Sequence, residues 1–297
     1  MPRRAGGGAA HFALDIDGFN MGWVRSASGG NAVADVVAEP PDAAGLVDKH
    51  LGQVRYEDVE VVAGLDLQAA FYQWIGGSFS GAATRKDGSI VAADFDYKAV
   101  TAKDFFQALI TEVTFPALDG ASKDAGFLTV KLSPGYVRYR KASGEKVSGT
   151  ASKKAKQWLV SNFRVELGDL PCAKVVAVDS FTCKVQAADS HGETRDIVRT
   201  PGRMEFPNLH LRIAATDAGA WVDWHKSFVI DGKCGPDQEL AGSLQFLAPD
   251  MKQLARIDLS GVGIFRLAPD EGMAGEDTIA TVVADLYCEA MDLTVAG

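Results

Sequence analysis

Cysteine is scarce in this sequence, and the first half of the chain has none. The four that occur are Cys172, Cys183, Cys234 and Cys288. They form no C-x-x-C pair, which argues against a thiol redox motif and a cysteine zinc cluster. The sequence therefore predicts a reduced, cytoplasmic setting in which these residues act as small buried apolar groups, while a disulfide between two of them stays open.

Long apolar runs and an excess of basic charge are also missing. No segment has 18 or more uncharged apolar residues, so no membrane-spanning helix is expected. The formal net charge is −9, with 15 basic and 18 acidic side chains in residues 1–150, and 15 and 21 in residues 151–297. This acidic balance argues against a protein that grips nucleic-acid phosphates, although nucleic acid can still pass nearby.

Common catalytic motifs are absent: the chain has no G-x-x-x-x-G-K-[ST], G-x-G-x-x-G, G-x-S-x-G or H-E-x-x-H. The candidates for a metal site are His210 and His225, with Asp223 or Asp231. No H-x-H or H-x-x-x-H spacing supports them, so surface or hydrogen-bonded histidines are favoured. No catalytic, cofactor-binding or metal-ligating residue is therefore predicted.

Two segments lack the apolar residues that a folded core needs. Residues 1–10, MPRRAGGGAA, predict a short disordered arm and not a secretory signal, because no apolar stretch follows the arginines. Residues 141–157, KASGEKVSGTASKKAKQ, have no large apolar residue except Val147. They predict a flexible linker that spans roughly 20–25 Å. The basic residues Lys153, Lys154 and Lys156 within it are interpreted as solvated charges.

The linker divides the chain into two predicted domains, residues 11–140 and residues 158–297. At 297 residues the chain is long enough for two domains that each bury a core.

The two predicted domains carry the same order of sequence patterns. FALDIDGFN from Phe12 and FRVELGDLP from Phe163 each alternate apolar and polar residues and then reach a Gly/Asp pair, which predicts a strand and a hairpin turn twice. Arg55–Gly77 and Glu205–Ser227 then match without a gap at an offset of 150. Each predicts a half-buried strand followed by a short helix with an aromatic face. The matched anchors are Tyr56 with Phe206, Val59 with Leu209, Val61 with Leu211, Phe71 with Trp221, and Trp74 with Trp224.

Further matches extend the repeat. Asp66 and Thr216 hold the same repeat position and are the predicted N-caps of the two helices. The next block places Phe115 opposite Phe265, and each half ends in an apolar strand. The order of patterns repeats although identical residues are few. The sequence therefore predicts a tandem duplication of one β-rich domain of roughly 150 residues.

One motif suggests an enzyme. ALDIDGFN resembles the nucleophile loop of haloacid-dehalogenase-type phosphatases, in which Asp15 would attack phosphorus and Asp17 would protonate the leaving group beside Mg²⁺. That chemistry also needs a Lys, a Ser or Thr and a later acidic pair on an α/β scaffold. The chain has no long amphipathic helices to build one, and the second copy has Glu166 and Gly168 instead. An acidic hairpin turn is favoured, and the phosphatase is the alternative.

A soluble module with an aromatic ligand pocket is a third possibility. The aromatic residues concerned are Phe71, Tyr72, Trp74, Trp221 and Trp224. Their helical spacing is more typical of a packed core than of a ligand site.

The first half resembles the tail tube proteins of contractile phages and of related contractile injection systems. The similarity covers about residues 11–140 and rests on FALDIDGFNMGWVRSASGG, a long loop, and KHLGQVRYEDVEVVAGLDLQAAFYQWIGG. The positions that match the family's patterns are Lys49, Gly52, Tyr56, Glu57, Asp58, Phe71, Tyr72, Trp74 and Ile75. The second half is connected to the family only through the internal repeat.

The resemblance implies a mainly β fold of two tandem tail-tube-like β-barrel or sandwich domains, each with one short flanking α-helix. It implies a structural subunit and not an enzyme, which assembles with itself into trimer or hexamer rings around a channel by joining sheet edges. The expected partners are neighbouring tube, sheath, spike or baseplate proteins, with no membrane. DNA or protein cargo would pass through the channel without specific binding.

Two arrangements stay open for a chain with two such domains. Three chains can close a pseudo-six-fold ring of six domains, as in a hub at the base of a tube, or each chain can supply one domain to each of two stacked rings. The divergence between the halves favours a single ring. In either case, the chain is expected to assemble in the bacterial cytoplasm and to become part of a phage virion or an injection particle.

Overall fold

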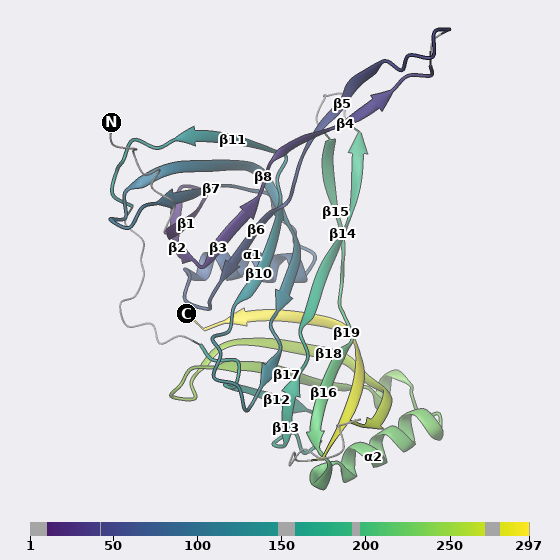
Figure 1. Ribbon diagram of the computed structural model, residues 1–297. Helices are drawn as coiled ribbons and strands as arrows, with labels where there is room; N and C mark the ends of the chain where they lie inside the picture. Colours follow the sequence, from purple (N-terminus) through teal and green to yellow (C-terminus); the bar gives the residue numbers. More distant parts are fainter. Residues whose placement is uncertain (1–10, 42, 148–157, 192–196, 271–279, 297) are drawn as a thin grey trace.

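The computed structural model describes residues 11–41, 43–147, 158–191, 197–270 and 280–296. Below, "first half" means residues 11–147 and "second half" means residues 158–296. Strands dominate both halves, and each half has one short α-helix, as the sequence predicts (Figure 1).

The described elements are mostly strands, and side chains alternate between buried and more exposed positions in strands such as Val59–Ala63 and Leu209–Ala214. In the first half they are β1 (His11–Ile16), β2 (Phe19–Val24), β3 (Ser26–Gly29), β4 (Ala32–Ala38), β5 (Lys49–Tyr56), β6 (Val59–Ala63), α1 (Ala69–Phe79), β7 (Lys86–Ala93), β8 (Ala99–Phe115), β9 (Leu118–Asp119), β10 (Leu128–Ser133) and β11 (Tyr136–Lys141). In the second half they are β12 (Phe163–Leu167), β13 (Val175–Val178), β14 (Phe181–His191), β15 (Ile197–Glu205), β16 (Leu209–Ala214), η1 (Ala215–Asp217), α2 (Gly219–His225), η2 (Lys226–Ile230), η3 (Pro236–Gln238), β17 (Leu240–Leu247), β18 (Gln253–Pro269) and β19 (Thr281–Val295).

The strand order of the two sheets is the same. In the first half the order is β1-β7-β8-β10-β6-β3, with β2 added beside β1. In the second half the order is β12-β17-β18-β19-β16-β13. Each strand of one list occupies the place of its repeat partner in the other, and neighbouring strands are antiparallel in both. This shared topology is what a tandem duplication requires.

The ladders also fix how the repeat aligns residue by residue. The offset is 150 at β6 and β16, but it is 154 at β7 and β17 and at β8 and β18. Both long strands bulge at the same place, since Thr111 in β8 and Phe265 in β18 are each skipped by the ladder. The predicted match of Phe115 with Phe265 is therefore wrong, because the segment after the second helix is four residues longer. Phe115 corresponds to Pro269.

The predicted hairpin turn occurs only once. Asp17 and Gly18 join β1 to β2 with φ values of +51° and +82°, the left-handed pair that a tight two-residue turn needs. In the second half β12 also ends in a turn, at Gly168 and Asp169. The following strand, β13, pairs with β16 and β9 instead of returning along β12. The prediction of a second hairpin is therefore wrong.

The predicted helix caps are also wrong. The N-cap positions are Gln68 for α1 and Ala218 for α2, and neither side chain caps its helix. Asp66 lies two residues before the α1 N-cap, and Thr216 lies within η1, where its hydroxyl donates a hydrogen bond to Asp217. An irregular segment precedes α1 and the 3-10 turn η1 precedes α2, so the pattern predicts each helix correctly but its start two residues too early.

A single apolar core runs through both halves. Figure 1 shows the second half below the first, with α1 lying between the two sheets. The ring of Phe115 stacks on Phe181 at 4.8 Å and on Phe246 at 5.7 Å between centroids. The halves are therefore packed together and not merely tethered.

The predicted domain boundaries stay a prediction. The first seven residues of the predicted linker are held against the first half by hydrogen bonds. The N–H of Ala99 donates to the carbonyl of Glu145 at 2.9 Å, and the N–H of Val147 donates to the carbonyl of Tyr97 at 2.8 Å. Val147 also packs against a small apolar cluster around Ala13. The rest of the predicted linker, residues 148–157, and the predicted arm, residues 1–10, lie outside the described residues.

Candidate assembly interfaces

The acidic pair in the first hairpin serves the turn. Asn20 donates a hydrogen bond from Nδ2 to Asp15 Oδ1 at 2.8 Å, and Lys86 Nζ lies 2.5 Å from Asp17 Oδ2. The backbone N–H of Asp87 donates to Asp17 as well. These contacts tie β1, β2 and β7 together and place the pair on a β-sheet, without the α/β scaffold that the phosphatase alternative needs. An acidic hairpin turn is the interpretation that the geometry favours.

The two candidate histidines lie in different settings. His210 is on β16, with Nδ1 2.7 Å from Asp285 Oδ1, and Arg266 donates to the other carboxylate oxygen at 3.0 Å. Burial favours the neutral acid, but these two partners outweigh it and lower the pKa of Asp285. His225 ends α2. Within the described residues, no three His, Cys, Asp or Glu side chains gather as a metal site.

The aromatic residues of the helices are mostly core. Phe71, Tyr72 and Trp221 are almost completely buried, and Trp74 donates its indole N–H to the carbonyl of Thr84 at 2.8 Å. The Tyr72 hydroxyl donates to the Gly64 carbonyl at 2.7 Å, and burial raises its pKa.

Trp224 differs from this core set, because it is only half buried and its indole N–H has no partner among the described residues.

Three of the four cysteines behave as predicted. Cys172, Cys183 and Cys288 are buried, and all four thiols are free in the structure. Burial raises the pKa of Cys183 to about 12, so this thiol stays protonated. Cys234 is exposed, contrary to the prediction, because it lies in the loop after the second helix.

Besides the short pairing of β9 with β13, the two halves meet in a contact that has two parts and is here called the internal joint. The first is a short ladder between the end of β8 and the start of β14. It pairs Glu112–Phe115 with Phe181–Lys184 in antiparallel fashion. The hydroxyls of Thr114 and Thr182 are 2.9 Å apart, and Lys184 lies 3.8 Å from Glu112. A strand of the second half thus extends a sheet of the first half.

The second part of the internal joint is the packing of α1 on β19. A Cβ built on Gly76 would lie 2.8 Å from the carbonyl oxygen of Leu293, so only glycine permits this approach. One turn further along α1, Phe79 meets Phe206 edge to face at 5.9 Å. Both Phe79 and Leu293 are almost completely buried as a result.

The elements that form the internal joint recur at the outer ends of the chain without a partner. The counterpart of Glu112–Phe115 in the repeat is Arg266–Pro269 of β18. Among the described residues, this stretch pairs with β19 on one side and with nothing on the other. On the first half, β4 pairs only with β5 in the described part of the chain. At the positions that correspond to the internal ladder, each half therefore has one strand edge that is used and one that is open.

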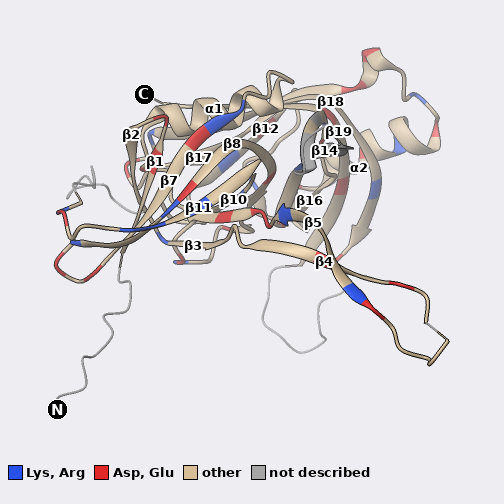
Figure 2. Cartoon of the chain, turned by 90° about the horizontal axis from the view of Figure 1, so that it is seen from above, with Lys and Arg blue, Asp and Glu red and all other residues tan. Residues whose placement is uncertain are grey.

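Exposed apolar side chains gather on three parts of the molecule, which is where assembly surfaces are expected. They lie on the arm formed by β4 and β5, on the second helix, and along one end of the first half. The arm carries Val36, Val37, Leu46, Val47 and Leu51; the second helix, α2 with its π-helical continuation η2, carries Val222, Val229 and Ile230; the end of the first half carries Phe95, Tyr97, Val100 and Tyr139. Figure 2 shows the arm projecting from the body, with basic and acidic residues interspersed along the strands.

A family of known proteins matches the first half of the chain. Residues 8–138 match the family model of the T4-like virus tail tube protein gp19. The resemblance of the first half to the tail tube family is confirmed. A search of curated proteins found no match.

Several solved structures are similar to about half of this chain. A chain of the PVC extracellular contractile injection system, in its sheath–tube complex in the extended state, is 18% identical, with 47% of this chain and 95% of that chain covered and a TM-score of 0.42. A chain of the anti-feeding prophage cap is 19% identical over 48% of this chain and 95% of that chain, with a TM-score of 0.42. Hcp1 from Flavobacterium johnsoniae is 18% identical over 47% of this chain and 99% of that chain, with a TM-score of 0.29.

The residues that build the internal joint escaped sequence reasoning. Phe115 is one of the predicted anchors, but the pattern places it opposite a residue four positions away from its true counterpart. The Gly76-Gly77 pair within a predicted helix was the available signal, because glycine inside a helix often marks a close approach of another backbone.

Proposed function

We propose that this chain is a structural subunit of a phage tail or contractile injection apparatus, in which three copies close a ring of six tube-like domains. The observation that carries the proposal is the internal joint. Two halves with one strand order are joined side by side, by a sheet ladder and a helix contact, and each still has an open edge at its outer end. A contact of this head-to-tail type closes into a ring when its rotation permits.

The side-by-side ladder favours one ring over two stacked rings. In a stacked arrangement the strand edges of the two halves would serve different layers, whereas here β14 extends the sheet that contains β8. Six tube-like domains from three chains give the pseudo-six-fold symmetry of a hub or an adaptor ring, which joins three-fold and six-fold parts of an apparatus.

The arm formed by β4 and β5 is the proposed contact with neighbouring parts of the apparatus. It leaves the body as a two-stranded sheet and exposes Val36 and Leu51, which are 63% and 68% accessible. The hairpin of β14 and β15 leaves the second half toward the same side (Figure 1). A ring would therefore present such hairpins on one face, toward tube, sheath, spike or baseplate proteins. No helix in the described part of the chain is long and apolar enough to span a membrane.

Purified protein tests the proposal through its mass in solution. Light scattering coupled to size exclusion, over a wide range of protein concentrations, is expected to give a discrete complex of three chains. A variant that carries both Val36→Asp and Leu51→Asp should still form the complex of three chains but should no longer form larger complexes of stacked rings. A protein that stays monomeric at every concentration would overturn the proposal.

A further inference from the structure

The outer ends of the chain carry the two sides of one further contact. We infer that the open edge Arg266–Pro269 of β18 and the end of the second helix dock on the start of β4 and on the neighbouring cleft of a second copy, repeating the internal joint between chains. This inference rests on the proposed ring and adds which residues meet. Below it is called the external joint.

The register of the external joint follows from the ladders. Within the chain, Glu112–Phe115 pairs with Phe181–Lys184. The repeat counterparts are Arg266–Pro269, at an offset of 154, and Gly30–Val33, at an offset of 151. Leu267 of one copy then lies opposite Ala32 of the next. Because Pro269 has no N–H, the ladder ends there, just as the internal ladder ends at Phe115.

A cleft of about 590 Å³ lies on the first half. The equivalent place on the second half is filled by residues of the first half. The cleft is lined in part by Val33 and Tyr56. Their counterparts in the second half are Lys184 and Phe206, which contact Glu112 and Phe79 of the first half. The same structural position is thus occupied inside the chain and vacant at its outer end. A second copy of the chain is the occupant that fits, because it supplies the matching strand and helix.

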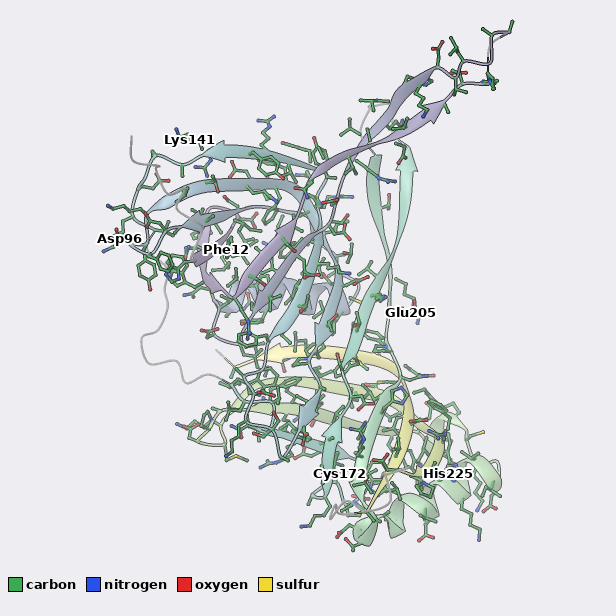
Figure 3. All side chains as sticks on the ribbon, in the orientation of Figure 1. Phe12, Asp96, Lys141, Cys172, Glu205 and His225 are labelled. Atoms are coloured by element: carbon green, nitrogen blue, oxygen red, sulfur yellow. The ribbon has the colours of Figure 1, made fainter. Side chains whose placement is uncertain are left out.

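Apolar side chains at the internal joint are buried, whereas their repeat counterparts at the outer ends of the chain are exposed. Leu293 is covered by α1 and only 6% exposed, whereas its counterpart Tyr139 is 63% exposed. Phe79 is 5% exposed, whereas Val229, at the same repeat position, is 43% exposed. Beside Tyr139, a smaller cavity of about 120 Å³ is lined by Phe12 and other residues of β1, β3, β7 and β8. In Figure 3, Phe12 lies within the first half and His225 lies at the edge of the second half, so the two surfaces are well separated.

The external joint must be looser than the internal one at a single point. Gly76 lets α1 approach β19 closely, but its counterpart is Lys226, at the start of the wider turn η2. A side chain there holds the second helix further from β11. We therefore expect the sheet ladder and the end of the helix to carry the external joint, and the chains to separate before the two halves of one chain do.

Paired cysteines test the register directly. In a Cys234→Ser background, which removes the exposed native thiol, Ala32→Cys and Leu267→Cys together are expected to form disulfides between chains on mild oxidation. The double variant should give bands of two and three chains on a non-reducing gel, ending at three. A mixture of the two single variants should stop at two chains. Ala38→Cys with Leu267→Cys, placed at the far end of the same strand β4, is the control that should not cross-link.

The outcomes separate the inference from the proposed function. Complexes of three chains that form without the Ala32–Leu267 cross-link would overturn the external joint but leave the ring intact. Chains that neither assemble nor cross-link would overturn both. As a second test, Val229→Asp is expected to raise the concentration for half-assembly at least tenfold, whereas Met251→Asp, at a side chain 56% exposed in the turn between β17 and β18, should leave it unchanged. Equal effects of the two substitutions would contradict the placement.

Discussion

Replacing Gly76 with alanine should break the internal joint at its tightest point. The new Cβ would lie 2.8 Å from the carbonyl oxygen of Leu293, and α1 cannot move away without disturbing the contact of Phe79 with Phe206. Overpacking of this kind costs about 1–3 kcal/mol. The substitution also gains about 1 kcal/mol of helix propensity, so the stability change of this variant alone understates the clash.

Gly77 provides the matched control. It lies in the same helix, and a Cβ there meets only the carbonyl oxygen of Ala82 at 3.5 Å, an ordinary contact. Both variants gain the same helix propensity, so the difference between their free energies of unfolding isolates the contact with β19. We expect Gly76→Ala to be less stable than Gly77→Ala by about 1–3 kcal/mol.

Urea unfolding at low protein concentration measures this difference without a contribution from assembly. The two variants should also differ in Tm by roughly 2–4 °C for each kcal/mol. Two equally stable variants would refute the reasoning, because they would show that α1 does not rest on the second half at Gly76.

Three further predictions follow from buried and exposed groups. Phe115→Ala should cost about 3–5 kcal/mol of unfolding free energy, because Phe79, Phe181 and Phe246 each lose a ring contact, while Phe265→Ala should cost less than about 1 kcal/mol; similar costs in urea would contradict the corrected repeat register. The lowered pKa of Asp285 adds stability that is present above its unfolded pKa of about 4 and is lost as the pH falls through the lower folded value, so Asp285→Asn should flatten the acid limb of a Tm–pH curve. A thiol reagent should label one residue per native chain, Cys234, and labelling of two or more would show that the buried thiols are accessible.

Much of the fold could be predicted from the sequence, because the repeat signals are local. The alternation of Val59 and Val61 and the helical spacing of Phe71 and Trp74 predict β6 and α1 correctly, and their counterparts lie at the predicted offset of 150. Such periods reflect which face of an element is buried, and that survives divergence of the residues themselves.

The register of the long strands could not be predicted in the same way. Nothing in the sequence shows that four residues are inserted after the second helix, so an alignment by aromatic anchors put Phe265 opposite Phe115. The predicted N-caps are wrong for a related reason, because the segment before each helix shifts the helix start by two residues and leaves Asp66 and Thr216 outside the helix.

The candidate interfaces depend on contacts between residues far apart in the chain. No pattern at Thr114 or Thr182 indicates that the two strands pair, and Gly76 shows only that some backbone comes close. The exposure of Tyr139 gains meaning only beside its buried counterpart Leu293. Comparison of the two halves in three dimensions is therefore what identifies the open ends.

The central claim is that three chains place six tube-like domains in one ring. Cryo-electron microscopy of the assembled protein tests it most directly. Class averages are expected to show rings of six lobes with three-fold symmetry, in which lobes of two shapes alternate. Rings in which all six lobes are alike within one layer, with the second half of each chain in another layer, would contradict the account.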